Sequence, residues 1–484
     1  PLLHRSELLA QLLEGHETLL ITGTHGKTTT SSLVSHVLME SGLDPTFALG
    51  GIALNTKTNG RVGKGQYFVA EADESDGSFL NYTGHSAIIT NIEEDHLDYW
   101  KTKEALVEGF KTFANRISKY LWWCIDECGL TLPGKSYGFS TDADLQITAW
   151  EQKGWHLVFD LKQGQNRYSQ IEIPLLGRHN VLNATAVFGL CLELGVSEEN
   201  IRSAFKTFKG VKRRMEQKGE NRGIKVLDDY AHHPTEIETT LKGLRQAAGE
   251  KRVIALFQPH RFSRLKDCWD GFLNAFESAD VVFMTDVYAA GEKPIDGISA
   301  EKLYQELKQK LSIPVFFAPR DQLLRAVGEF ARPHDVLITL GAGDVTYLSD
   351  ELADYPFKPY RMIVLQGGRS AEHEVALLSS KMVTEALDSN FYDFERWTIS
   401  KDGEWMKEGV KTSLPDVTQE ILKADLVYPI LHGPFGEDGM IQGFLETLGI
   451  PYVGCDFRAC ALTMDKAWTK RVVQTYGIRV ARFV

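Results

Sequence analysis

Two glycines, a lysine and a run of hydroxyl side chains stand close together in ITGTHGKTTT, residues 21–30. Gly23 and Gly26 allow a tight turn. Lys27 can reach an outer phosphate, and Thr28 can offer its hydroxyl to Mg²⁺. The two glycines are closer together than in the common GxxxxGK[ST] loop, so the pattern predicts a short form of phosphate-binding loop. The alternative is a glycine turn beside a surface lysine.

Acidic side chains and a histidine follow the next two apolar runs of the sequence. Carboxylates at the end of a strand, close to a phosphate-binding loop, can hold Mg²⁺ against the phosphates of a nucleotide. A histidine beside carboxylates can bind a metal or orient a ligand. The alternatives are a solvated acidic loop and a structural histidine. The first run is followed by Glu71, Asp73, Glu74 and Asp76, and the second by Asp95, His96 and Asp98.

These residues need strands and helices to position them, and the sequence predicts both. Short apolar runs such as residues 18–22 and 253–258 alternate with amphipathic stretches, which indicates a multidomain α/β fold with mostly parallel sheets. After Gly26 apolar residues recur at helical spacing, so the loop should lie at a helix N-terminus, whose N–H groups favour phosphate. Between Asp144 and Leu176, strands separated by glycine turns predict an antiparallel meander in a small side sheet.

Length and composition limit the possible functions. The 484 residues, 43% of them hydrophobic and 24% charged, are enough for about three or four globular domains. A net charge of −12 argues against general nucleic-acid or membrane-surface binding, so an anionic substrate must meet a local basic pocket. The six cysteines lack zinc-site spacing and no apolar run is long enough to cross a bilayer, so we expect a cytoplasmic protein.

Later clusters add amides and arginines. Asn180 and Asn183 lie three apart at an expected helix start, where both amides can face an adenine edge or can cap the helix instead. Arg214 lies at an expected hinge between domains, where a guanidinium can close onto phosphate. Arg261 and Arg264 follow a strand and can clamp a small carboxylate such as that of an amino acid.

Taken together, these motifs resemble one family. GTHGKTTT, EADESDGSF and TNIEEDHLD, in this order and spacing, are similar to the central ATPase domain of the Mur ligases, specifically the UDP-N-acetylmuramate:L-alanine ligases. GRHNVLNATA at 177–186 resembles the adenine-side motif of that family. DDYAHHPTE at 228–236 and FQPHRFSR at 257–264 resemble its C-terminal domain. The short phosphate-binding loop is the form that this family uses.

The resemblance implies a ligation with three substrates. ATP would phosphorylate the lactyl carboxylate of UDP-N-acetylmuramate, and the amine of L-alanine would then displace phosphate from the acyl phosphate to form an amide. Phosphorylation is needed because a carboxylate has no leaving group. On this basis Lys27 serves phosphate and not the core, so Lys27→Ala should abolish turnover and leave the fold intact.

The same resemblance implies roles for individual residues. The expected ATP contacts are Gly23, Thr24, His25, Gly26, Lys27, Thr28, Thr29, Asn180, Asn183, Arg214 and Asp229. The expected ligands of Mg²⁺, or of Mn²⁺ in its place, are Thr28, Glu71 and His96. The expected catalytic residues are Lys27, Glu71, His96, Arg214, His233 and Arg261, and the amino-acid site takes His260, Arg261 and Arg264. Some relatives carry a carbamylated lysine after the DHLD motif, but Phe110 falls there and Lys111 only beside it, so we expect no carbamylation.

A second resemblance begins at Met362. IVLQGGRSAEHEVALLSS and LVYPILHGPFGEDGMIQGFLETLGIPYVG, followed by ALTMDK, are similar to the N-terminal domain of the D-alanine:D-alanine ligases. In this likeness Glu372 is catalytic and serves a D-alanine site with His432, while Lys466 lies toward ATP. A helix-start acid and a loop histidine are the alternatives. The ATP-grasp domain of that family would follow Val484, so we expect a fusion of two ligases whose second half is incomplete.

These patterns predict four parts of the chain. Residues 1–17 would be a remnant of a UDP-binding domain, 18–210 a central P-loop ATPase domain, 211–353 a Rossmann-like C-terminal ligase domain, and 360–484 a pre-ATP-grasp α/β domain. We expect both ends of the sequence to be cut. Two other hypotheses are a different muramyl-peptide or folylpolyglutamate-type ligase, and a nucleotide-binding scaffold without ligase chemistry. The downstream arginine and histidine clusters argue against the scaffold, which would not need them.

Overall fold

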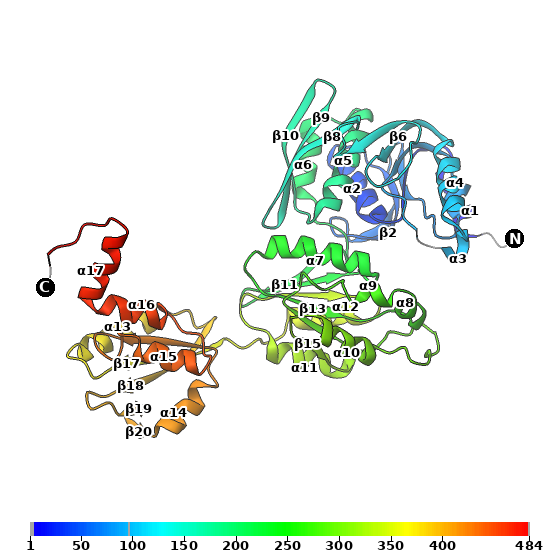
Figure 1. Ribbon diagram of the computed structural model, residues 1–484. Coiled ribbons are helices and arrows are strands. Elements are labelled where there is room, and N and C mark those ends of the chain that lie inside the picture. The colour runs from blue at the N-terminus through cyan, green and yellow to red at the C-terminus, as the bar shows by residue number, and fades with distance from the viewer. Residues whose placement is uncertain (1–3, 95–96, 483–484) are drawn as a thin grey trace. The chain divides into compact units, whose positions relative to one another are not determined.

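The computed structural model describes residues 4–94 and 97–482, and the chain divides into two compact units. The larger unit holds Pro1–Glu220, Lys225–Val327 and Asp335–Tyr355, and the smaller holds Asn221–Ile224, Gly328–His334 and Pro356–Val484. Both units are α/β, as predicted, with helices packed on sheets (Figure 1). Within the described residues, no helix combines the length and the apolar character needed to span a bilayer.

The first sheet of the larger unit is built around β1 (Glu17–Thr22). β1 pairs in parallel with β4 (Tyr67–Glu71) on one side and with β5 (Gly84–Ile89) on the other. Residues 19–21 of β1 are fully buried, as expected of a central parallel strand covered on both faces. The strand order is β10-β9-β8-β7-β6-β5-β1-β4-β2-β3. The remaining strands are β2 (Thr46–Ala53), β3 (Thr58–Arg61), β6 (Ile117–Cys124), β7 (Lys135–Gly138), β8 (Leu145–Lys153), β9 (His156–Gln163) and β10 (Asn166–Ile173).

The predicted meander is present, but it is not a separate side sheet. β8, β9 and β10 are antiparallel neighbours, and β8 pairs in parallel with β7, so the meander continues the first sheet. The side-sheet prediction was wrong because periodicity reveals strands but not the edge that they join. The helices of this part are α1 (Arg5–Leu13), α2 (Lys27–Glu40), η1 (Ser78–Asn81), α3 (Leu97–Trp100), α4 (Lys103–Ala114), α5 (Arg178–Glu193) and α6 (Glu198–Thr207).

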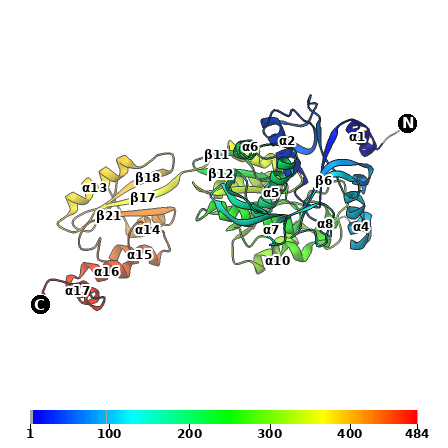
Figure 2. The ribbon, with the colours of Figure 1, turned by 90° about the horizontal axis from the view of Figure 1, so that it is seen from above.

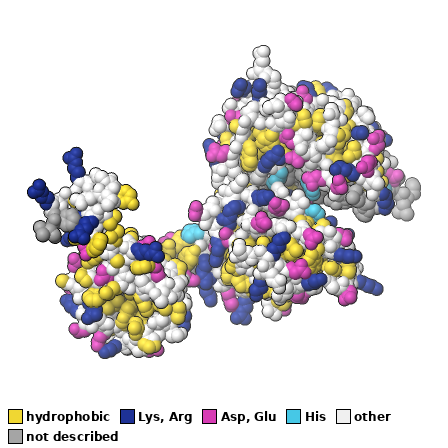
Figure 3. All heavy atoms as spheres, viewed as in Figure 1, with side chains coloured by type: hydrophobic (Ala, Val, Ile, Leu, Met, Phe, Trp, Pro, Cys, Tyr) yellow, Lys and Arg dark blue, Asp and Glu magenta, His cyan; other side chains and the backbone are white. Residues whose placement is uncertain are grey.

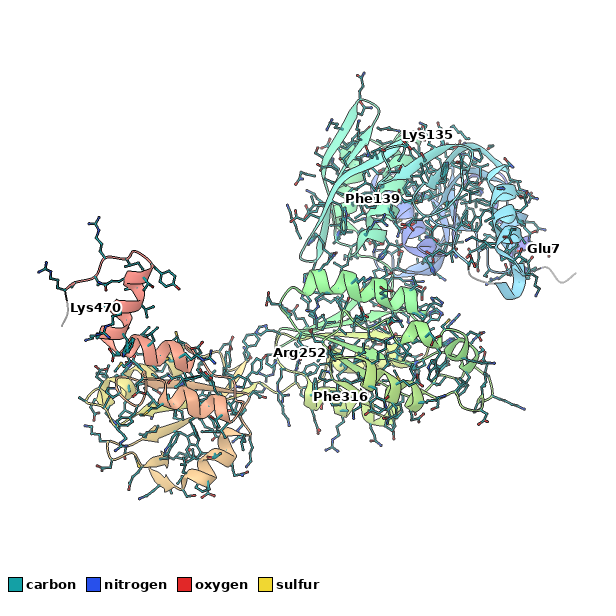
Figure 4. The ribbon with its side chains drawn as sticks, viewed as in Figure 1. Glu7, Lys135, Phe139, Arg252, Phe316 and Lys470 are labelled. Atoms are coloured by element: carbon teal, nitrogen blue, oxygen red, sulfur yellow. The ribbon has the colours of Figure 1, made fainter. Side chains whose placement is uncertain are left out.

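The second sheet has the strand order β11-β12-β16-β13-β14-β15 and is parallel from β12 to β15. Arg252, labelled in Figure 4, immediately precedes β13 in the sequence, and Asp335 immediately precedes β16. The Arg252 guanidinium donates two hydrogen bonds to the Asp335 carboxylate (3.0 and 2.7 Å). The strands are β11 (Glu216–Asn221), β12 (Ile224–Asp229), β13 (Val253–Phe257), β14 (Val281–Met284), β15 (Val315–Phe317) and β16 (Val336–Leu340). The helices are α7 (Pro234–Ala248), α8 (Phe262–Asp267), α9 (Trp269–Phe272), α10 (Ala300–Lys310), α11 (Arg320–Phe330) and α12 (Val345–Ala353).

The smaller unit has its own sheet, in the order β20-β19-β18-β17-β21. Alternate residues of β17 enter two apolar clusters: Ile363 packs with α14 and α15, and Val364 packs with α13, so helices cover both faces (Figure 2). The strands are β17 (Tyr360–Gly367), β18 (Tyr392–Ile399), β19 (Trp405–Lys407), β20 (Val410–Thr412) and β21 (Leu426–Leu431). The helices are α13 (His373–Ala386), α14 (Leu414–Ile421), α15 (Met440–Thr447), α16 (Phe457–Met464) and α17 (Lys466–Thr475).

Candidate active site

The loop between β1 and α2 has the backbone that phosphate binding requires. Gly23 and Gly26 have φ angles of 129° and 85°, a region that glycine adopts readily and other residues do not. A side chain at Gly23 would meet the Thr90 hydroxyl at 2.1 Å, so the end of β5 closes tightly on the loop. Because Gly26 is the N-cap of α2 and has no side chain to cover the helix, the first backbone N–H groups of α2 face the loop.

Lys27 is anchored inside this loop. Its Nζ donates to the carbonyl oxygens of Gly23 (2.7 Å) and Thr24 (3.2 Å), and to Glu74 Oε2 at 2.8 Å. The Glu74 side chain is 1% exposed, so the ammonium group compensates a buried carboxylate. This contact leads us to predict that Lys27 supports the fold as well, in contrast to the expectation from the sequence, which does not show that Glu74 is buried beside it. The contact of Lys27 with phosphate stays a prediction.

Glu71 lies at the C-terminal end of β4, next to the loop. Its Oε2 accepts a hydrogen bond from the Thr28 hydroxyl (3.1 Å), and its Oε1 accepts from the Ser31 hydroxyl (3.1 Å) and the Gly50 N–H (2.6 Å). Burial raises the pKa of Glu71 in spite of these donors. Thr28 and Glu71 thus bring together oxygen ligands of the kind that Mg²⁺ prefers. The third expected ligand, His96, lies outside the described residues.

His25 occupies the middle of the loop. Asn91 holds its backbone, because Asn91 Oδ1 accepts from the His25 N–H (2.8 Å) and Asn91 Nδ2 donates to the His25 carbonyl (2.9 Å). The imidazole lies between Glu93 (Nε2 to Oε2, 3.6 Å) and Glu236 (Nδ1 to Oε1, 3.5 Å). Burial lowers the pKa of His25, but the two carboxylates outweigh burial and raise it to about 9. His25 is therefore a cation at neutral pH.

The two amides predicted to face adenine lie at the start of α5 and are buried. Asn180 donates to the Leu176 carbonyl (2.8 Å), and Asn183 donates to Asn180 Oδ1 (3.1 Å). A Cβ at Gly26 would lie 2.8 Å from Asn183 Oδ1, so the amide of Asn183 rests against the phosphate-binding loop. The pair therefore ties α5 to the loop, and its contact with adenine stays a prediction.

Two adjacent arginines between the sheets have different environments. Arg213 has a φ of +61°, donates to the Gly341 carbonyl (2.6 Å) and places Nε 3.6 Å from the fully buried carboxylate of Asp228. Arg214 lies over the ring of Tyr230 at 5.5 Å, and no carboxylate of the described residues lies within 4.0 Å of it. Arg213 is thus built into the domain by direct contacts, whereas Arg214 acts on the carboxylates of Asp229 and Glu236 only at longer range. Arg214 is the residue predicted to contact phosphate.

Asp229 ends β12 and uses both carboxylate oxygens on the backbone. Oδ2 accepts from the N–H of Met215 (2.8 Å) and Oδ1 accepts from the N–H of Ala231 (2.8 Å). Burial raises the pKa of Asp229 to about 6, although Arg214 opposes this. Asp229 thus stabilises the segment that connects the two sheets, and its contact with ribose stays a prediction. The predicted catalytic residue His233 follows closely as the N-cap of α7.

Histidines and arginines gather at the ends of β12 and β13. The rings of His232 and His260 meet edge to face at 5.7 Å, and His260 stacks on Tyr288 at 5.6 Å. Burial first, and then the charges of His232 and two nearby arginines, Arg264 and Arg261, lower the pKa of His260 to about 4. Arg261 has a φ of +66°, a strained conformation of the kind that clusters at functional sites. Figure 3 shows histidine side chains gathered on the face of the larger unit.

The position after the DHLD motif carries no available lysine. Phe110 is fully buried on α4. Lys111 turns outward, about half exposed, with its Nζ 3.7 Å from Glu108. Lys111 thus lies on the solvent side of α4, where we identify no role in the site.

In the smaller unit the two residues predicted for D-alanine lie together. One oxygen or nitrogen atom from each of Glu372, His432 and Glu437 lies within 4.8 Å of the others. The Ser379 hydroxyl lies 3.0 Å from His432 Nε2 and fixes the ring. Glu437 and Ser379 were not identified from the sequence, because only the fold brings them to His432. Two carboxylates beside an imidazole suit a small ammonium group. Lys466 begins α17.

A glycine loop between a parallel strand and a helix, with acidic side chains at the end of the next strand, defines a nucleotide-binding α/β protein. Residues 21–191 match the Mur ligase middle domain, 213–343 the Mur ligase glutamate ligase domain, and 361–455 the D-ala D-ala ligase N-terminus. The UDP-N-acetylmuramate–L-alanine ligase of Protochlamydia amoebophila is 49% identical over 72% of this chain and 78% of its own. The chain belongs to the Mur ligase family.

Two further relatives are similar over different shares of the chain. The bifunctional enzyme MurC/Ddl of Chlamydia trachomatis is 42% identical over 99% of this chain and 61% of its own length. The crystal structure of UDP-N-acetylmuramate-alanine ligase MurC from Thermotoga maritima has a TM-score of 0.63 and 27% identity, covering 72% of this chain and 77% of that one. The chain spans about three fifths of the length of the bifunctional relatives. The family and the fold class expected from the motifs are confirmed.

Proposed function

We propose that the chain is part of an ATP-dependent ligase that joins L-alanine to the lactyl carboxylate of UDP-N-acetylmuramate through an acyl phosphate. One observation carries the proposal: a single compact unit holds both a phosphate-binding loop and a histidine and arginine cluster, and Glu236 contacts both. A nucleotide switch would need only the loop. A ligase needs the loop to transfer phosphate and the cluster to receive an amino acid.

In the first step the residues of the loop neutralise charge and align the phosphates. Lys27 and Arg214 would contact the transferring phosphoryl group, and the N–H groups at the start of α2 would hold the neighbouring phosphate. The oxygens of Thr28 and Glu71 fit Mg²⁺, which when bound neutralises charge between the outer phosphates. An oxygen of the lactyl carboxylate attacks the γ-phosphorus in line, ADP leaves, and the acyl phosphate remains.

In the second step the cluster presents the amino acid. Arg261 and Arg264 would hold the carboxylate of L-alanine, because guanidinium groups pair with carboxylates in a fixed geometry. The lowered pKa of His260 keeps its ring neutral at pH 7, so the ring does not repel the ammonium group of L-alanine, which loses its proton to solvent before it reacts. The free amine then attacks the acyl carbon, and inorganic phosphate leaves.

For the smaller unit we propose the N-terminal part of a D-alanine:D-alanine ligase, which makes the full-length protein bifunctional. Glu372 would receive the ammonium group of D-alanine, and His432, fixed by Ser379, would lie beside it. The support is the proximity of residues that are far apart in the sequence, together with the match of residues 361–455 to that domain.

A phosphate-release assay on the full-length protein tests the function. We expect phosphate release that requires MgATP, UDP-N-acetylmuramate and L-alanine together, with L-serine and glycine as weaker substrates and L-glutamate inactive. With ¹⁸O in the lactyl carboxylate, one ¹⁸O should appear in each released phosphate. Activity with L-glutamate instead would indicate another ligase of the superfamily, and nucleotide binding without release would indicate a scaffold.

A further inference from the structure

One side chain connects the phosphate-binding loop with the amino-acid cluster. The ring nitrogens of His25 lie 3.6 Å from Glu93 and 3.5 Å from Glu236. Glu93 follows β5, in the sheet that carries the loop, whereas Glu236 lies in the first turn of α7, beside the second sheet. His25 therefore has one carboxylate partner from each of the two domains of the larger unit.

The backbone of His25 is fixed on the loop side. Asn91 pairs with both its N–H and its carbonyl, and the Thr90 hydroxyl donates a second hydrogen bond to that carbonyl (2.6 Å). The backbone that carries the ring is therefore fixed to the loop. A shift of the loop would carry the ring with it.

Glu236 also contacts the histidines of the cluster. Its Oε2 accepts from the N–H groups of His232 (3.2 Å) and His233 (3.3 Å) and lies 3.3 Å from His232 Nδ1. The ring of His232 in turn meets that of His260, beside the expected amino-acid clamp. Burial raises the pKa of Glu236, but His25, His232 and Arg214 outweigh burial and lower it. With the cations of His25 and Arg214 nearby, the Glu236 carboxylate stays charged and keeps its hydrogen bonds to the backbone before α7.

We propose that His25 is a positioning residue that couples the two halves of the active site. Its imidazolium holds Glu236, and through Glu236 it holds the backbone of His232 and His233 in the arrangement that the amino acid requires. The inference rests on the proposed ligase function and adds a coupling to it: MgATP in the loop and L-alanine at the cluster strengthen the binding of each other. Such coupling is reciprocal by thermodynamic necessity.

Steady-state kinetics of the full-length protein test this coupling with three variants: His25→Gln, Glu236→Gln and the double variant. Glutamine at 236 still accepts the two N–H hydrogen bonds but no longer attracts the imidazolium. We expect His25→Gln to raise the KM for L-alanine, and Glu236→Gln to raise the KM for ATP, each roughly fivefold to twentyfold. The double variant should be no worse than the poorer single variant, because both changes break the same contact.

A matched control is available in the same domain. His85 on β5 forms a similar pair with Glu17 on β1 (Nε2 to Oε2, 3.4 Å), away from the loop, so His85→Gln should leave both KM values unchanged. The inference is overturned if His25→Gln affects only ATP and Glu236→Gln affects only L-alanine, or if their effects multiply in the double variant. Thermal melting checks that each variant folds. If His25→Gln does not fold, the test depends on whether Glu236→Gln raises the KM for ATP. Turnover by the unmodified protein tests the ligase function separately. If that turnover is present but the variants show no coupling, the inference fails while the ligase function stands.

Discussion

Replacing Lys27 by methionine should unfold the central domain at a lower temperature, as well as stop turnover. The ammonium group lies 2.8 Å from Glu74 Oε2, and the Glu74 side chain is 1% exposed. Removing one partner of a buried ion pair leaves the other charge uncompensated, which costs about 3–5 kcal/mol. The substitution also removes the donor to two loop carbonyls, those of Gly23 and Thr24. A loss of this size is a large part of the stability of a typical domain.

Thermal unfolding measures this loss directly. For a domain of this size each kcal/mol lowers the melting temperature by about 2–4 °C, so Lys27→Met should lower it by roughly 6–20 °C. Tryptophan fluorescence is a suitable signal, because Trp100, one of the nine tryptophans of the chain, donates its Nε1–H to the Glu74 carbonyl (2.9 Å). The double variant Lys27→Met/Glu74→Gln should recover most of the melting temperature, since no unpaired charge remains. Neither variant should release phosphate.

An equal melting temperature for Lys27→Met and the unmodified protein would refute the reasoning and return Lys27 to a role in phosphate binding alone. The control is Lys103→Met, which breaks a pair of similar length with Glu94 (2.8 Å) in which both side chains are more than half exposed. Solvent screens that pair, so its loss should leave the melting temperature unchanged.

Three further predictions follow from the site. Arg214→Ala should lower kcat about 10²–10³-fold, with a smaller loss of melting temperature than Arg213→Ala, because Arg214 acts on the buried carboxylates of Asp229 and Glu236 only at longer range. Arg213→Ala leaves the buried carboxylate of Asp228 without its nearest cation, and kinetics and melting together distinguish the two variants. Gly50→Ala places a Cβ 2.5 Å from Glu71 Oε2 and should weaken Mg²⁺ binding about tenfold or more. In the control Gly60→Ala the nearest atom to the new Cβ is 3.9 Å away, so Mg²⁺ binding, measured by titration, should not change. Because its pKa is raised to about 9, His25 is charged below that pH and loses its ion pair with Glu236 above it. The KM for L-alanine should therefore rise as the pH passes through about 9, and His25→Gln should abolish this rise.

The sequence predicted those parts of the site that follow directly from a strand and its end. The loop of Gly23 to Thr28 lies after β1, and Glu71 lies at the end of the neighbouring strand β4. Both could be predicted because an apolar run followed by glycine or acid is a local pattern, and parallel strands bring their carboxyl ends to one edge. The meander was recognised for the same reason, although its attachment to β7 was not.

The remaining contacts depend on segments that are distant in the sequence. Ser31 and Gly50 bind Glu71 from α2 and β2, and Glu236 reaches His25 across more than two hundred residues. None of these partners carries a pattern of its own, since a serine on a helix or a glutamate in a first turn is common for other reasons. Packing of the two domains selects them, and packing cannot be read from periodicity.

Histidine shows most clearly why residue type alone does not determine chemistry. His25 faces Glu93 and Glu236, and these carboxylates raise its pKa to about 9 although burial opposes them. His260 is partly buried near Arg261 and Arg264, and its pKa is lowered to about 4. The loop therefore gains a fixed cation where phosphate charge must be balanced, while the cluster keeps a neutral ring that does not repel an incoming ammonium group. The two steps of the proposed ligation need these opposite charge states at the same pH, and burial together with the surrounding carboxylates and guanidinium groups separates them.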